Sequence, residues 1–471
     1  MSSEERIEQL ERENAALRLE LEKRDERDKE RARENAALRV ELEKLRREIE
    51  EWKRGFRERG KRRTSRTESR KRGERKKSGR RAGHAAAHRA VPGHVDHEQV
   101  HPTPATCPCC GGPVEATAET VSTLEIDVPP VKPEVTRHSS VVGRCKQCAS
   151  RVVAPLPGAS ANGTTVAPVT FGANLQSIAL SMRFELKASL GGIGKFMGQW
   201  FGVEISAGGL VGIYNRLQVR SAPATSEIQT CLRNASVVGI DETGWRQDGL
   251  PGYCWLARTD KLSLYRVELS RARWVAESIL GAQYGGTVVS DFYAVYTGQG
   301  TWINAFCGAH LIRETKKIAE LQPCAETAEF RDRVKAFYET GAEAAKSGDI
   351  LARRGARIRL GHLASSLNYV AFPDIVTLQE RIDIHWHGIT RFLDDPAVPW
   401  HNNATESDFR VVGRYRAITG GTRSPRGSVV YGHWMSVVYT RRKNGLPLTT
   451  FVRAVNDAYR DARAPPSVFV N

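Results

Sequence analysis

The sequence has no long apolar run, and this absence excludes a membrane-spanning helix. No stretch of its 471 residues approaches the roughly 18 to 20 uninterrupted apolar residues that such a helix needs. The first residues are charged rather than apolar, so we expect no secretory signal peptide. We therefore expect a soluble, cytoplasmic protein that does not bind membranes.

Cysteine is scarce, and acidic residues are too few to balance the basic ones. The chain has 9 Cys, five of them in two tight clusters, which suits a reducing compartment and a metal site better than a disulfide framework. Lys and Arg number 71 against 54 Asp and Glu, a formal net charge of +17. Residues 53–89 contain 17 of these cations and only 3 Glu, so they alone contribute +14. This excess favours a polyanionic partner.

A heptad pattern from Ile7 to Trp52 predicts a coiled coil over residues 1–52. The hexapeptide at 12–17 recurs at 33–38, an offset of three heptads that preserves the register. Asn14 and Asn35 then occupy equivalent core positions, and a buried Asn pair favours a parallel dimer. Charged residues at 24, 28 and 31 interrupt the seam, so a solvated single helix is the alternative.

Residues 53–90 combine Arg, Lys, Ser and Gly with almost no apolar side chains, which predicts a disordered basic linker. Its cations would contact nucleic-acid phosphates without reading sequence, and a plain solubilising spacer is the alternative. The candidate contacts are Arg62, Arg63, Arg72, Lys76, Lys77, Arg80 and Arg81.

Two Cys-x-x-Cys pairs predict a zinc-binding, ribbon-like module over residues 91–160. Cys107 with Cys110 and Cys145 with Cys148 each present two thiolates at the spacing that tetrahedral zinc requires. Alternating segments at 123–128 and 135–142 predict a β-hairpin between the pairs. Cys109 is a fifth candidate ligand. Pairing Cys107 with Cys110 is preferred, because it places a glycine where the tight turn of the knuckle needs one. Reduced cysteines without a metal are the alternative.

Residues 161–235 are expected to be helical, in three pieces at 172–186, 190–201 and 207–217. Ser206 is the predicted N-cap of the third piece. The segment is either a helix-turn-helix or a helical spacer that packs on the next domain.

From residue 237 the pattern changes to short apolar runs. Strands are predicted at 237–240, 253–258, 262–269 and 287–290, with a helix at 271–280 before the last strand. Three strands, a helix and a fourth strand are typical of the start of an RNase H-like α/β domain, expected over 236–435 and followed by a tail segment at 436–471. Asp241 and Asp291 end the first and fourth strands. These strands are neighbours in such a sheet, so their carboxylates would lie side by side.

Glu406 is the candidate third carboxylate, on a helix that begins at Asn402 or Asn403. Hard oxygen ligands favour Mg²⁺ or Mn²⁺, and two such ions can promote in-line displacement at phosphorus. The alternatives are ordinary ones: an Asp that only forms a turn, and a surface ion pair between Glu406 and Arg410. Cys307 and His310 lack the partners of a second metal site, so a structural role is preferred for them.

The chain resembles a known family at four motifs, namely Asp241-Glu-Thr, Ser290-Asp-Phe-Tyr-Ala-Val-Tyr296, Cys307-Gly-Ala-His310-Leu-Ile-Arg313 and Asn402-Asn-Ala-Thr-Glu406. These are similar to motifs of the TnpC-type DDE transposases of the bacterial insertion-sequence sixty-six group. The resemblance implies an RNase H-like catalytic core, a zinc-binding domain and an amino-terminal zipper. It implies metal-binding roles for Asp241, Asp291 and Glu406, and a helical insertion that corresponds here to about 325–395.

We therefore expect a transposase that cleaves DNA and transfers strands of an insertion sequence with magnesium or manganese. Its partners would be element ends and target DNA, a second copy or more of the chain, and helper proteins from the same element, at the bacterial nucleoid. Arg410 and Arg423 are further candidate DNA contacts. The alternatives are an inactive DNA-binding derivative and a nuclease without strand transfer.

Overall fold

The computed structural model describes residues 26, 91–129, 131–154, 156–159, 164–297 and 300–470. The chain divides into two compact units, Met1–Ile126 and Asp127–Asn471, and each is described by itself. The predicted coiled coil and basic linker, with its seven candidate phosphate contacts, lie outside the described residues, apart from Glu26. Within the described part of the chain, no helix has the length and apolar character needed to cross a membrane.

The predicted hairpin between the cysteine pairs is wrong. Residues 123–128 and 135–142 form no strand. A short antiparallel ribbon of β1 (Gly143–Arg144) and β2 (Arg151–Val152) lies nearby. Val135 is 95% exposed and Val141 93% exposed. The alternating pattern therefore has no core in which to bury one of its faces.

Four helices follow: α2 (Ala173–Phe184), α3 (Leu190–Phe201), α4 (Ala207–Arg220) and α5 (Pro223–Arg233). The three predicted pieces correspond to the first three, and the predicted N-cap is confirmed, because Ser206 accepts a hydrogen bond from the N–H of Gly209 at 3.0 Å. Leu180, Leu210 and Ile228 of these helices belong to the same hydrophobic core as the central sheet. The segment thus packs on the next domain, while DNA reading by α3 and α4 stays a prediction.

The centre of the second unit is a mixed sheet with the strand order β5-β4-β3-β6-β7. Its strands are β3 (Val237–Gln247), β4 (Leu250–Arg258), β5 (Ser263–Glu268), β6 (Thr287–Ser290) and β7 (Ile303–Phe306), with α6 (Arg273–Leu280) and α7 (Ala294–Thr297) in the connections. β3, β4 and β5 are antiparallel, and β6 and β7 continue the sheet parallel to β3. The predicted adjacency of the first and fourth strands is confirmed.

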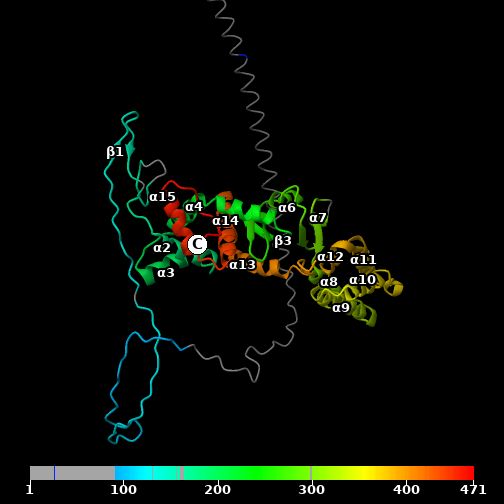
Figure 1. Ribbon diagram of the computed structural model, residues 1–471, viewed down its shortest axis with the longest axis horizontal. Coiled ribbons are helices and arrows are strands. Elements are labelled where there is room, and N and C mark those ends of the chain that lie inside the picture. The colour runs from blue at the N-terminus through cyan, green and yellow to red at the C-terminus, as the bar shows by residue number, and fades with distance from the viewer. Residues whose placement is uncertain are drawn as a thin grey trace, which may run out of the picture. The chain divides into compact units, whose positions relative to one another are not determined.

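Three helices complete this body (Figure 1). α13 (Asn403–Thr419) packs on β3 and β4, α14 (Pro425–Lys443) on β5, and α15 (Leu448–Arg460) on α2 and α4. Gly432 allows α14 to approach the sheet, because an added Cβ would lie 2.8 Å from the Tyr265 carbonyl oxygen. The boundary predicted at 435/436 falls inside α14, whose buried side chains join the main core on both sides of it. The residues after 435 are therefore part of the same body.

The segment predicted as a helical insertion, about 325–395, consists of helices. Between β7 and α13 the chain forms α8 (Gly308–Leu321), α9 (Ala325–Ser347), α10 (Ile350–Ala364), η1 (Leu367–Tyr369), α11 (Pro373–Ile384) and α12 (Trp386–Asp394). Phe330, Leu360 and Ile382 help to form a second core, which meets the sheet at Val289 and Phe306. In Figure 1 these helices lie to the right of the sheet.

Candidate active site

Asp241 lies on β3 where the strand changes its pairing. β3 pairs in parallel with β6 only from Val237 to Gly239, but its antiparallel pairing with β4 continues to Gln247. The prediction that Asp241 ends its strand is therefore wrong, because β4 supplies hydrogen-bonding partners beyond it. The Asp241 carboxylate accepts a hydrogen bond from the N–H of Glu242 at 2.8 Å.

Asp291 directly follows β6, as predicted. Its Oδ1 accepts a hydrogen bond from the N–H of Tyr293 at 3.0 Å. The register pairs Gly239 with Val289. Asp241 lies two residues after Gly239, and Asp291 lies two residues after Val289. The parallel pairing therefore brings the two carboxylates to adjacent positions at one edge of the sheet.

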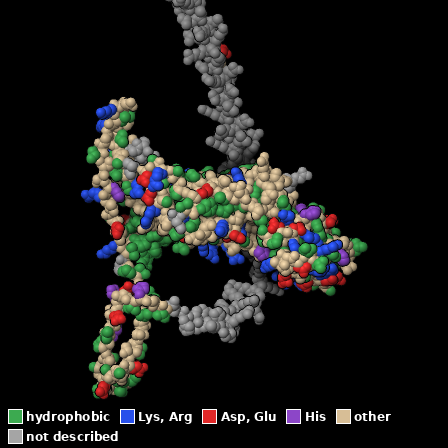
Figure 2. Space-filling view, in the orientation of Figure 1, with side chains coloured by type: hydrophobic (Ala, Val, Ile, Leu, Met, Phe, Trp, Pro, Cys, Tyr) green, Lys and Arg blue, Asp and Glu red, His purple; other side chains and the backbone are tan. Residues whose placement is uncertain are grey.

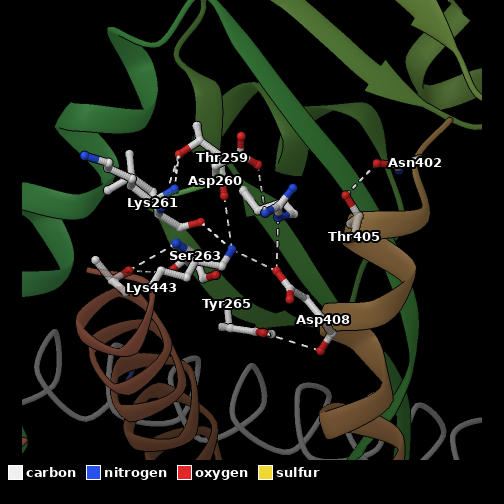
Figure 3. Close-up of polar contacts among 12 residues, drawn as sticks. Thr259, Asp260, Lys261, Ser263, Tyr265, Asn402, Thr405, Asp408 and Lys443 are labelled. Carbon is white, nitrogen blue, oxygen red and sulfur yellow. Dashed lines mark hydrogen bonds and ion pairs between the residues drawn. The ribbon is translucent and has the colours of Figure 1, made fainter. Parts of the chain in front are cut away.

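Glu406 occupies the first turn of α13, which lies close against β3 (Figure 3). Asn402 Nδ2 donates to the carbonyl oxygen of Ile240 at 3.2 Å, and the Thr405 hydroxyl donates to Asn402 Oδ1 at 2.5 Å. At Gly239 an added Cβ would lie 2.6 Å from Thr405 Oγ1. Asn402 holds the N-cap position, but its side chain caps no helix N–H and instead ties α13 to the strand.

One turn further along α13, Asp408 fixes the helix to its surroundings. Its Oδ2 lies 3.1 Å from Arg258 Nε at the end of β4 and 2.8 Å from Lys443 Nζ at the end of α14 (Figure 3). All three side chains are largely buried, so their charges are screened little by solvent. The helix that carries Glu406 is thus held at both of its first two turns.

Burial and the neighbouring carboxylates disfavour the ionised form of Asp241. Burial, followed by the charges of Glu242, Asp291 and Glu406, raises the pKa of Asp241 to about 7. Like charges in a poorly hydrated place have this effect, and a cation among them would reverse it.

The present partner of Glu406 is a guanidinium from α8. Glu406 Oε1 lies 3.1 Å from Arg313 Nη2 and 3.8 Å from His310 Nε2. The ion pair with Arg410 that sequence left open is not formed among the described residues. In the same part of the chain, no three His, Cys, Asp or Glu side chains converge closely enough to hold a metal ion. The backbone thus places three carboxylates around one edge of the sheet, with the third turned toward Arg313.

Two family models match the chain. The family described as "Transposase IS66 family" matches residues 168–429, more than half of the chain and a span that contains all three carboxylates. The chain belongs to this transposase family. The resemblance found in the sequence is confirmed, and the zinc-finger binding domain of transposase IS66 also matches, at residues 104–149. No curated protein matches the chain.

The zinc-finger match contains all five clustered cysteines of the transposase, and the first knuckle is a closed turn. The N–H of Cys107 donates to the carbonyl oxygen of Gly112 at 2.8 Å, and the N–H of Gly111 donates to that of Cys107 at 2.8 Å. Gly111 has a φ of 74°, as its predicted role in the turn requires. Hydrogen bonds from the backbone N–H groups of Cys109 and Cys110 lower the pKa of Cys107 and so favour its thiolate.

The second knuckle has the same hydrogen bonds. The N–H of Cys145 donates to the carbonyl oxygen of Ser150 at 2.9 Å, and the N–H of Ala149, at a φ of 56°, donates to that of Cys145 at 3.0 Å. Hydrogen bonding to Ser150 lowers the pKa of Cys148 to about 7. Cys148 is the fourth residue of its turn, and the fourth residue of the first turn is Cys110.

A buried network beside Asp241 was missed by sequence reasoning. Glu242 is 8% exposed, and it receives hydrogen bonds from Arg271 Nε at 2.6 Å and from the Tyr296 hydroxyl. Burial raises the pKa of Glu242, against the opposing effects of the Tyr296 hydrogen bond and the Arg271 charge. The Arg271 guanidinium also lies 3.7 Å from the ring centre of Tyr293. Arg271 thereby joins the residue after Asp241 to the loop after Asp291.

The remaining predicted residues divide into structural and open cases. Cys307 is fully buried and its Sγ accepts a hydrogen bond from the N–H of Asn402 at 3.0 Å, which confirms its structural role. His310 instead faces Glu406. Arg410 on α13 and Arg423 before α14 are exposed, and their contact with DNA stays a prediction.

Proposed function

We propose that this transposase cleaves DNA strands and joins them to a target with two divalent metal ions bound by Asp241, Asp291 and Glu406. The observation that carries the proposal is the parallel register of β3 and β6, which brings Asp241 and Asp291 to adjacent positions. The strand order, with its antiparallel and parallel halves, supports an RNase H-like core. Glu406 reaches the same edge because α13 packs closely on Gly239.

The donor set fits Mg²⁺ or Mn²⁺. It consists of carboxylate oxygens, which these hard cations prefer. Burial and the charges of neighbouring carboxylates raise the pKa of Asp241, and a bound cation would oppose this effect. When bound, two such ions would activate the attacking hydroxyl and stabilise the leaving oxygen in an in-line displacement at phosphorus. The chain's own residues hold the geometry through the ties of α13 to β3 and of Arg271 to Glu242.

Arg313 has a second role in the proposal. It is 58% exposed and pairs with Glu406. If Glu406 turned toward the aspartates, this guanidinium would be free to contact a substrate phosphate next to the site.

We also propose that parts of the protein outside the core bind zinc and DNA. Cys107, Cys110, Cys145 and Cys148 would bind one zinc ion, supported by ligand spacing, the zinc-finger match and the shared turn. The basic linker, Arg410 and Arg423 would contact DNA phosphates, and the heptad segment would pair two copies of the chain. Helper proteins of the same element would be further partners.

The test is cleavage and strand transfer on a labelled element-end duplex with magnesium. Asp241→Asn, Asp291→Asn and Glu406→Gln should each abolish chemistry and leave DNA binding intact. Glu320→Gln is the matched control, because Glu320 is an exposed carboxylate on α8 whose ion-pair partner within the described residues is Lys316. Retained activity in Glu406→Gln would show that the third ligand is misassigned.

A DNA-binding derivative without turnover is the second candidate. The pairing of Glu406 with Arg313, and the lack of three converging ligands among the described residues, favour it. Wild-type protein that binds ends but never cuts, with magnesium or manganese and with candidate helpers, would establish this alternative.

A further inference from the structure

The face of α13 that carries Glu406 continues as a row of cations. Arg410 and Arg414 follow Glu406 at intervals of four residues, and both are exposed. Residues four apart share a helix face, and each interval advances about 6 Å along the axis. The row therefore leads from the proposed metal ligand to a point about 12 Å away.

Cations from two other elements lie at the far end of this row. The Arg183 guanidinium, at the end of α2, lies 4.5 Å from the ring centre of Tyr415, the residue after Arg414. Lys187, in the following loop, is 6% exposed, and its Nζ donates to the Tyr439 hydroxyl of α14 at 2.7 Å. Parts of the chain more than 200 residues apart thus bring positive charge to one place.

The charges in this place act on one another. Burial lowers the pKa of Lys187 most, followed by the charges of Arg442 and Arg414, and Glu185 opposes these effects more weakly. The backbone of Lys187 has a φ of 61°, a conformation that residues other than glycine rarely adopt. A buried, strained cation among other cations is costly, and such features gather where a ligand is held.

We use the name cation row for the five side chains that bring positive charge to this place, namely Arg183, Lys187, Arg410, Arg414 and Arg442. In the described part of the chain, none of the five forms an ion pair with a carboxylate. The neighbouring Lys443 contrasts with them, because it pairs with Asp408 at 2.8 Å (Figure 3).

Other cations of this body have acidic partners. On α9, the side chains of Arg331, Arg333 and Lys335 each pair with Asp or Glu. In Figure 2 the helical insertion, at the right, shows blue and red side chains intermixed. Among the described residues no ion pair compensates the cation row, and Arg410 lies one helical turn from Glu406.

We propose that the exposed arginines of the cation row, Arg410, Arg414 and Arg442, bind the phosphate backbone of duplex DNA and lead it to Asp241, Asp291 and Glu406. One DNA strand carries a phosphate about every 3.4 Å of axis, so the 12 Å between Glu406 and Arg414 spans about three to four phosphates. Exposed guanidinium groups suit bidentate contacts with them. This inference rests on the proposed function for the place to which the DNA is led, but DNA binding by the row can be tested without cleavage.

The test uses the full chain with three exposed arginines replaced, Arg410→Gln, Arg414→Gln and Arg442→Gln. Affinity for a fluorescein-labelled 40-base-pair duplex is measured by anisotropy from 50 to 200 mM KCl, without magnesium. Each phosphate contact contributes about 0.9 to the slope of log affinity against log salt. Loss of three contacts should lower the slope by about 2.7, so wild-type affinity should fall about 40-fold more across this range than that of the variant.

The matched control removes the same charge from α9 through Arg331→Gln, Arg333→Gln and Lys335→Gln. Its slope should equal that of wild type. In wild type, DNA should also protect Arg410, Arg414 and Arg442 from phenylglyoxal, read by mass spectrometry, and leave the α9 arginines reactive. An unchanged slope in the row variant, or row arginines that DNA does not protect, would overturn the proposal. Because the experiment measures no cleavage, it would test DNA binding by the cation row even if the protein never cuts DNA.

Discussion

Replacement of Gly239 by alanine should impair catalysis without impairing DNA binding. The added Cβ would lie 2.6 Å from Thr405 Oγ1 and 3.0 Å from Asn402 Oδ1. Ordinary contact begins at 3.4 Å, so the closer approach is about 0.8 Å too short. Both side chains are buried and hydrogen-bonded to each other, so they cannot easily turn away. The strain is therefore expected to push the start of α13 away from β3.

Glu406 lies on that turn and would move with it. A misplacement of about 1 Å at a reacting site can cost on the order of 100-fold in rate, so we expect cleavage to slow by about this factor. Overpacking should also lower the free energy of unfolding by about 1 to 3 kcal/mol. Cleavage is measured on the element-end duplex, and duplex affinity by anisotropy.

Gly413→Ala is the control on the same helix, since an added Cβ there meets nothing within 4 Å. It should retain activity. Thr405→Ala in the Gly239→Ala background removes the closest clashing atom and should restore part of the rate. Wild-type cleavage by the single Gly239→Ala variant would refute the argument that this contact sets the position of Glu406.

Two further changes test the core and the knuckles. The His433 ring is 3% exposed and bonded to the Ser221 and Thr225 hydroxyls, and burial lowers its pKa to about 3. The unfolded His binds a proton below about pH 6.5, whereas the folded one does not. Between pH 7 and pH 5, wild type should therefore lose about 2 kcal/mol more free energy of unfolding than His433→Gln, as measured by urea denaturation. Equal losses in the two proteins would contradict this. Cys148→Ser should release zinc to a chromogenic chelator, whereas Cys109→Ser should retain it, and equal zinc contents would contradict the equivalence of the two turns.

Much of the central sheet and of the helices around it could be predicted from short-range sequence patterns. The run at 287–290, Thr-Val-Val-Ser, contains no charged side chain and is followed by Asp291, which suits a fully buried parallel strand. The end of β3 could not be predicted, because residues 241–247 are mostly polar and the strand continues only through pairing with β4. The exposed segments at 123–128 and 135–142 show the converse, since alternation without a core to cover does not produce a strand.

The contacts that complete the site are long-range and have no local signal. Glu242 gave no sign that it would be buried, because its partner Arg271 is 29 residues away. The pairing of Arg313 with Glu406 joins residues 93 apart. Gly239 looks like an ordinary strand glycine until α13 is placed on it. Sequence therefore predicted the three candidate carboxylates, while the groups that hold them depend on the packing of helices and strands.

The helical insertion separates the carboxylates in time as well as in sequence. Asp291 and Glu406 are 115 positions apart, and the insertion with its own core occupies most of that interval. At about 5 to 20 residues per second, a ribosome needs roughly 6 to 23 s to pass from one to the other. During this interval the nascent chain has both aspartates but lacks Glu406, so the proposed three-carboxylate site cannot form until the insertion has been made.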